Sequence, residues 1–194
     1  SPPIRNVGTL GGNIANGSPI GDSMPALMVL GTSLVLRKGV DQRELALDEF
    51  YRSYQVNDLQ PGEFVATIRI PLPDDGVVVS SQKWSKRFDQ DISAVCTAYR
   101  LQLDGDTVTS FRMACGGLAE IVKRASACEE AVNGAAWSEE TIDSACDGLA
   151  RDFSPITDMR ASADMRLVAV QNLLRRFWLE TSGEAPQTVY TYGR

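Results

Sequence analysis

The feature that most constrains the fold is a change in the spacing of apolar residues along the chain. Up to about residue 120, apolar and polar residues alternate in short segments separated by Gly, Pro and Asp, the pattern of β-strands. From about residue 121 the apolar spacing becomes 3.6 residues, the pattern of amphipathic helices. Because strands come first and helices follow, we predict an α+β fold, with a small antiparallel sheet packed against a helical C-terminal subdomain.

Strand and helix positions follow from the same pattern. The strand-like segments are 33–37, 43–47, 63–70, 77–86, 93–103 and 107–115. The first four read as an antiparallel meander, and the last two as a hairpin turned by Asp104-Gly105-Asp106. The predicted helices are 122–133, 138–152 and 163–181, with Ser138 and Ser162 as N-caps. An apolar stripe on the last helix should pack on the hairpin.

The residue types present exclude several kinds of chemistry. The chain has no histidine, so a Ser-His-Asp triad, a Cys-His pair and every His-ligated metal site are excluded within it. Its four cysteines lack the close spacing of a zinc or iron–sulfur site and read as reduced, buried thiols. We therefore predict no catalytic side chain and no metal ligand here.

Charge and hydropathy bear on partners and location. The net charge of −6 disfavours a nucleic-acid partner, since phosphate binding needs clustered Lys and Arg. The longest apolar runs fall far below the roughly 18 residues that a membrane span needs. The first residues also lack the basic start and apolar stretch of a secretory signal. We expect a cytoplasmic protein with neither a membrane nor a nucleic acid as partner.

The first thirty residues are rich in Gly, Asn, Ser and Pro and read as a structured loop that leads into a short helix capped by Asp22 or Ser23. The stretch Gly8-Thr9-Leu10-Gly11-Gly12-Asn13 would let backbone N–H groups approach a phosphate or a flavin. As a pattern it is weak, because it is not G-x-G-x-x-G and most glycine loops are only turns. A cofactor site and a plain turn both stay open.

Read whole, this segment resembles the flavin loop of the molybdenum hydroxylases. The resemblance rests on residues 4–15 (IRNVGTLGGNIA) and 18–22 (SPIGD), and continues at 83–87 (KWSKR), 91–95 (DISAV) and 116–119 (GGLA). It covers nearly the whole chain. Within the family, the FAD-binding region of xanthine dehydrogenase small subunits is the most similar.

The resemblance implies a fold and a division into domains. Residues 1–85 would be the second part of an FAD-binding domain, an antiparallel-sheet remnant of the FAD subdomain. Residues 86–185 would resemble the C-terminal domain of CO dehydrogenase flavoproteins, and 186–194 would be a tail. The family's other glycine-rich phosphate loop lies upstream of the matching segment and the chain lacks an initiator Met, so we expect a fragment that binds FAD weakly or not at all when isolated.

The resemblance also implies FAD contacts near the chain start. Thr9, Gly12 and Asn13 match residues that hydrogen-bond the diphosphate region through hydroxyl, backbone and amide groups. Ser18 and Asp22 match positions near the ribityl, diphosphate or ribose groups. The alternative for Asp22 is that it only caps the following helix.

Three further residues complete the expected FAD site. Asn16 stands where the family often has a small hydroxyl residue, and Val65 matches an apolar position whose backbone lies beside the adenine or the flavin. Lys83 matches a lysine beside the isoalloxazine, where a positive charge stabilises reduced flavin; the alternative is a solvated lysine at a strand end. Residues 84–91 match a mobile loop over the flavin face and include Lys86, Arg87, Asp89 and Asp91.

The function implied is electron transfer. A purine would be oxidised at a molybdenum centre in a molybdopterin-binding large subunit, and electrons would pass through [2Fe–2S] clusters of an upstream iron–sulfur domain to FAD and then, as hydride, to NAD. A close alternative is the medium subunit of CO dehydrogenase or of an aldehyde or N-heterocycle oxidoreductase. An alternative of another class is a non-catalytic interaction module.

Overall fold

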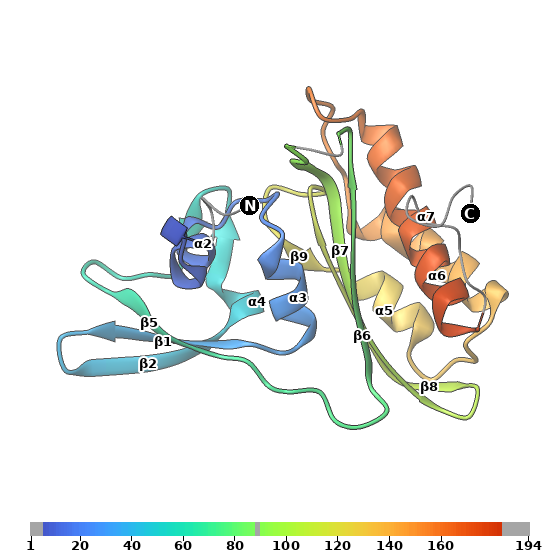
Figure 1. Cartoon of the computed structure of the whole chain (residues 1–194), viewed down its shortest axis with the longest axis horizontal. Coiled ribbons are helices and arrows are strands. Elements are labelled where there is room, and N and C mark those ends of the chain that lie inside the picture. Colours follow the sequence, from blue (N-terminus) through green and yellow to red (C-terminus); the bar gives the residue numbers. More distant parts are fainter. Residues whose placement is uncertain (1–5, 88–89, 184–194) are drawn as a thin grey trace.

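The computed structural model describes residues 6–87 and 90–183, and they form two sheet-containing halves joined by the segment 70–77 (Figure 1). The predicted tail 186–194 and Asp89 lie outside the described residues. The mixture of antiparallel sheets and helices confirms the predicted α+β class.

The first half is built around a three-stranded antiparallel sheet of order β2-β1-β5. Its elements are α2 (Leu10–Asn16), α3 (Ser23–Val29), β1 (Ser33–Lys38), β2 (Asp41–Ala46), α4 (Leu47–Phe50), β3 (Tyr51–Ser53), β4 (Val56–Asn57) and β5 (Phe64–Arg69). β3 and β4 pair as a small ribbon.

The glycine-rich stretch is a helix, so the prediction of a loop was wrong there. Thr9 is the N-cap of α2, and its side chain accepts a hydrogen bond from the Gly12 N–H at 3.0 Å. Gly17 ends the helix in the left-handed conformation, with φ of 60°. Two glycines disfavour a helix, but Ile14 is fully buried, and that tertiary contact outweighs the weak propensity.

The second half contains a four-stranded antiparallel sheet of order β6-β7-β8-β9. Its elements are β6 (Val78–Ser85), β7 (Ser93–Asp104), β8 (Thr107–Gly116), β9 (Lys123–Arg124), α5 (Ser126–Val132), α6 (Glu139–Asp152) and α7 (Ala163–Thr181). Ser138 and Ser162 cap α6 and α7 as predicted. The helix predicted over 122–133 begins later, because Lys123 and Arg124 pair with β8 as a short strand.

The first four predicted strands do not form one meander. β6 pairs with β7, whereas β1, β2 and β5 form the separate first sheet. Pro71 and Pro73 follow β5, and each lacks the N–H that a continuing ladder would need. The strand pairing therefore favours a division between the halves within 70–77, earlier than the boundary at residue 85 that the sequence suggested.

The sheet of the second half is covered on both faces. Figure 1 shows α5, α6 and α7 on one side of β6, β7 and β8, with α3 on the other. Toward the helices, Tyr99 stacks on Phe177 of α7 with ring centroids 4.4 Å apart, which confirms the predicted packing of the last helix. Toward α3, the sheet presents Ala98 and Ala114, whose small side chains let the helix approach closely.

Candidate functional site

An open groove of about 1280 Å³ runs between α2, the segment before α3, and the end of β6. Most of the residues predicted to contact a cofactor line it. These are Thr9, Gly12, Asn13, Asn16, Ser18, Asp22 and Lys83. Since Lys83 is far from the others in sequence, the tertiary fold is what brings it to them.

Val65 is the predicted residue that does not line this groove. It lies on β5 in a neighbouring hollow of about 470 Å³ that shares Thr9 and Gly12 with the groove. A Cβ placed on Gly11 would stand 4.0 Å from the Val65 carbonyl oxygen. The strand backbone thus adjoins the glycine stretch in a hollow that Lys83 does not line.

Polar groups of the glycine stretch are held in place by local hydrogen bonds. The Asn13 Oδ1 accepts a hydrogen bond from the Ser23 hydroxyl at 2.5 Å, which leaves the Asn13 amide N–H groups without a partner among the described residues. The Thr9 hydroxyl accepts from Gly12 and keeps its own proton for donation. A Cβ on Gly12 would stand 2.8 Å from the Thr9 Oγ1, so any side chain there would disturb the cap.

Lys83 is tied to two carboxylates. Its Nζ lies 2.7 Å from the Asp22 Oδ2 and 3.0 Å from the Asp91 Oδ2, and the Ser93 hydroxyl donates to the Asp22 Oδ1. Burial lowers the pKa of Lys83, but the hydrogen bonds and charges of both aspartates outweigh it and hold the pKa above its usual value. The hydrogen bond from Lys83 lowers the pKa of Asp91. The ammonium of Lys83 therefore lies between the side chains of two aspartates.

For Asp22 and Lys83, the alternatives to a cofactor contact are a helix cap and a solvated lysine at a strand end, and these contacts argue against both. Asp22 occupies the N-cap position of α3 without a side-chain hydrogen bond to the helix, so capping is not its role. Lys83 is not a lysine without partners at a strand end, because its ammonium is paired with both Asp22 and Asp91. The ion pair between Lys83 and Asp22 joins β6 to the segment before α3.

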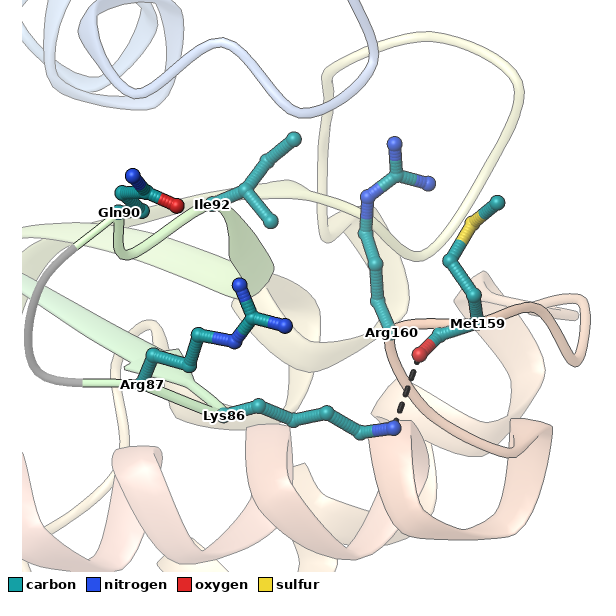
Figure 2. Close-up of a pocket in the computed structure, with 6 residues that line it drawn as sticks. All are labelled: Lys86, Arg87, Gln90, Ile92, Met159 and Arg160. Atoms are coloured by element: carbon teal, nitrogen blue, oxygen red, sulfur yellow. Dashed lines mark hydrogen bonds between the residues drawn. The ribbon is translucent and has the colours of Figure 1, made fainter.

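A smaller pocket of about 160 Å³ adjoins the groove and shares Arg87, Gln90 and Ile92 with it (Figure 2). Its other side is formed by Met159 and Arg160, from the segment before α7. The Lys86 Nζ donates to the Met159 carbonyl oxygen at 2.8 Å, and Figure 2 shows the Arg87 guanidinium pointing toward the middle of the pocket. Three cationic side chains therefore line this pocket, and one of them, Arg87, also lines the groove.

Several of these residues could not be identified from the sequence. Ser23, which orients Asn13, and Ser93, which binds Asp22, were not among the predicted site residues. Asp91 and Ser93 lie in the segment 91–95, which is part of the family resemblance. The alternation of residues along a strand does not predict which distant side chain each of them will contact. Met159 and Arg160 lie outside every motif.

A bound FAD requires polar groups for its diphosphate and ribityl chain and an apolar surface for its ring. Near α2 the groove offers the Thr9 hydroxyl, the Asn13 amide and the bare backbone of Gly12. Toward Lys83 it offers the side chains of Ile20 and Ile92. The residues present fit that group.

Two further properties concern the described ranges only. No helix within 6–87 and 90–183 is long and apolar enough to cross a bilayer. The His, Cys, Asp and Glu side chains of the same residues form no group of three or more that could hold a metal ion.

Two family models match the chain, one for each half. The FAD binding domain in molybdopterin dehydrogenase matches residues 1–73, and the CO dehydrogenase flavoprotein C-terminal domain matches residues 80–181. The fold and the groove thus define a class, the flavin-binding modules of molybdenum enzymes. The chain belongs to the family of FAD-binding modules of molybdopterin dehydrogenases, which confirms the resemblance seen in the sequence.

Individual relatives agree with this family. The chain is 34% identical over 160 residues to xanthine dehydrogenase/oxidase of Gallus gallus, covering 79% of this chain and 12% of that protein. It is 31% identical over 179 residues to the carbon monoxide dehydrogenase medium chain of Afipia carboxidovorans, covering 90% and 60%. The solved carbon monoxide dehydrogenase of Hydrogenophaga pseudoflava superposes with a TM-score of 0.86 at 28% identity, covering 91% of this chain and 61% of that one. The chain spans less than two thirds of each.

Proposed function

We propose that the groove between α2 and Lys83 holds FAD in an oxidoreductase of the xanthine dehydrogenase type. The supporting observation is that residues chosen from separate segments of the sequence, Thr9 to Asp22 and Lys83, line one groove. Bound FAD supplies the electron-transfer and hydride-transfer chemistry, so the absence of histidine is no obstacle.

Each residue of the groove then has a positioning role. The Thr9 hydroxyl and the Asn13 amide donate to the diphosphate, and Gly12 lets the backbone lie against it. Asn16 and Ser18 border the ribityl and ribose groups. Val65 approaches from β5, on the other side of α2, where its backbone borders the adenine end.

Lys83 lies at the ring end of this site, where its charge is opposed by two aspartates. A lone lysine would favour an anionic reduced flavin, whereas a lysine held by Asp22 and Asp91 favours it much less. The main role of Lys83 is therefore to hold the segment before α3 against β6, and so to fix the width of the groove.

The electron partners of the complete protein are part of the same proposal. A purine is oxidised at a molybdenum centre in a molybdopterin-binding large subunit, and [2Fe–2S] clusters of an iron–sulfur domain relay the electrons. The acceptor is NAD, and the cationic side chains of Lys86 and Arg87 beside the groove support this, since NAD carries two phosphates. The location is the cytoplasm, where purine catabolism takes place.

A second function has a specific observation in its favour. The chain covers 60% of the carbon monoxide dehydrogenase medium chain at 31% identity, and the same share of the xanthine dehydrogenase FAD-binding subunit of Escherichia coli O157:H7 at 26% identity. A medium subunit of a carbon monoxide, aldehyde or N-heterocycle oxidoreductase would use the same groove. The two functions differ in the substrate oxidised at molybdenum, which steady-state assays of the complete enzyme with xanthine and with carbon monoxide would separate.

The FAD site can be tested on this chain by titrating FAD into the 15N-labelled protein and following backbone amide shifts, which report even weak binding. We expect shifts at Gly11, Gly12 and Asn13 and around Lys83 in β6. NADH added after FAD should shift Lys86 and Ile92. The variant Asn13→Ala should weaken FAD binding roughly 3- to 10-fold, as expected for one lost hydrogen bond.

The matched control is Gln42→Ala, which removes an exposed amide side chain on β2, outside the groove. It should leave FAD binding unchanged. Absence of any shift at millimolar FAD both in this chain and in a longer chain extended upstream, or shifts confined to residues outside the groove, would contradict the proposal and favour an interaction module.

A further inference from the structure

Two arginines face each other on the sheet of the second half. Arg100 of β7 and Arg112 of β8 are directly opposite in the strand register, so their side chains leave the same face of the sheet. Like charges at directly opposite positions destabilise a strand pair. Both residues are half-buried, which weakens the screening of their repulsion by water.

Neither arginine forms an ion pair within the described residues, and the carboxylate of Asp74, which lines the same hollow, lies beyond ion-pair distance of both. Within residues 6–87 and 90–183, Arg100 donates only to the Ser110 hydroxyl, at 3.0 Å. The half-buried arginines Arg43, Arg124 and Arg160 all bind a carboxylate. The pair on β7 and β8 is thus exceptional in the described part of the chain.

The two side chains line a hollow of about 470 Å³ at the C-terminal end of α3. The segment that joins the two halves forms another wall, through Pro71, Leu72 and Asp74. Gly31, with φ of +74°, brings the chain after α3 close to Arg112: a Cβ there would stand 2.9 Å from the Arg112 Nη1. The hollow shares no residue with the candidate FAD groove, which lies at the other end of α3.

We propose that Arg100 and Arg112 form a binding site for a phosphate group, either free or carried by a small organic molecule. Guanidinium groups present N–H donors in a planar fork that matches the oxygens of a phosphate, and two of them can bind one dianion together. The bound anion offsets the repulsion between the arginines. Leu30 and Leu72 offer an apolar wall for an attached organic group.

The test is calorimetric titration of the whole chain with inorganic phosphate, at constant ionic strength set with chloride. We expect saturable binding to the wild type, with Kd roughly 10- to 100-fold weaker in Arg100→Gln and in Arg112→Gln, since each loses a charge-assisted hydrogen bond. The matched control is Arg37→Gln on β1, whose guanidinium binds the Gly39 carbonyl oxygen and lies outside this hollow. It should bind phosphate as the wild type does.

Phenyl phosphate distinguishes the two sources of the group. If phenyl phosphate binds more tightly than inorganic phosphate, and Arg112→Gln abolishes the difference, the site takes a phosphate carried on an organic molecule. If the two bind equally, the site takes the free ion. Equal Kd values in the wild type and both arginine variants, or no binding at tens of millimolar phosphate, would overturn the proposal. The FAD-induced amide shifts in Arg112→Gln report separately on the groove and should be unchanged.

Discussion

Replacing Asp158 by Asn should destabilise the protein more than any change at an exposed ion pair. The Asp158 Oδ1 accepts hydrogen bonds from the Arg166 Nη2 at 2.6 Å and from the Arg160 backbone N–H at 2.8 Å, and its Oδ2 accepts from the Arg160 Nη1 at 2.8 Å. Arg166 is only 2% exposed and also donates to the carbonyl oxygens of Ala94 and Gly117. Asn keeps the shape of the side chain but removes the negative charge.

The expected loss of stability follows from the buried charge of Arg166, which Asp158→Asn leaves without its carboxylate partner. Removing one partner of a buried ion pair typically costs about 3 to 5 kcal/mol, because the other charge stays buried. Asp158 is itself 20% exposed and Arg166 keeps two carbonyl acceptors, so we expect the lower end, about 3 kcal/mol. For a chain of this length that corresponds to a fall in Tm of roughly 6 to 12 °C.

Urea unfolding followed by circular dichroism measures the effect, with Asp143→Asn as the matched control. Asp143 pairs with Arg175 on the surface, where the side chains are 60% and 42% exposed, and this change should cost less than about 0.5 kcal/mol. Equal unfolding midpoints for the two variants would refute the reasoning. So would a change in the m-value without a loss of stability.

The same contacts set a pH dependence for Asp158. Burial raises the pKa of Asp158, but the hydrogen bonds from Arg160 and Arg166 outweigh it and hold the pKa well below its usual range. A carboxyl whose pKa is depressed by folding contributes stability above its unfolded pKa of about 4, and loses it as pH falls toward the folded value. The difference in the free energy of unfolding between the wild type and Asp158→Asn should therefore be largest at pH 7 and shrink below about pH 4.

Two other changes test the packing of the second half. Gly148→Ala should lower the free energy of unfolding by about 1 to 3 kcal/mol despite the better helix propensity of Ala, because the new Cβ would stand 2.8 Å from the Cys128 backbone nitrogen. The control is Ser144→Ala on the exposed side of α6, which should be neutral or slightly stabilising. All four cysteines are buried, and burial raises the pKa of Cys96 to about 12 and that of Cys146 to about 11. A thiol reagent at pH 8 should therefore label no cysteine in the native protein and all four in denaturant. Rapid labelling of any cysteine in the native state would contradict that second prediction.

Much of the second half could be predicted because its local signals agree with its tertiary contacts. The 3.6-residue period and the Ser caps located α6 and α7, and the Asp-Gly-Asp turn located the hairpin. The exception was residues 122–133, where strand pairing at Lys123 and Arg124 outweighs helix propensity. Such pairing depends on a distant strand and leaves no local pattern.

The first half was harder to predict for the same physical reason. Glycine in a helix is unfavourable by roughly 1 kcal/mol, so Gly11 and Gly12 indicated a loop. The burial of Ile14 and its contacts decide otherwise: the Tyr51 hydroxyl donates to the Ile14 carbonyl oxygen at 3.0 Å. The site residues could be chosen from the resemblance, but the pairing of Lys83 with Asp22 and Asp91 could not, because it joins three segments.

Glycines at the end of β8 are what bring those segments together. The Gly117 N–H donates to the Pro19 carbonyl oxygen at 2.7 Å, and a Cβ on Gly116 would stand 3.1 Å from that same oxygen. Gly117 also has φ of +85°, and a Cβ on it would lie 2.3 Å from the Ala94 carbonyl oxygen. Because no side chain intervenes, the segment before α3 lies directly on the sheet, and Asp22 reaches Lys83 and Ser93. The Gly116-Gly117 pair therefore shapes the candidate FAD groove without lining it.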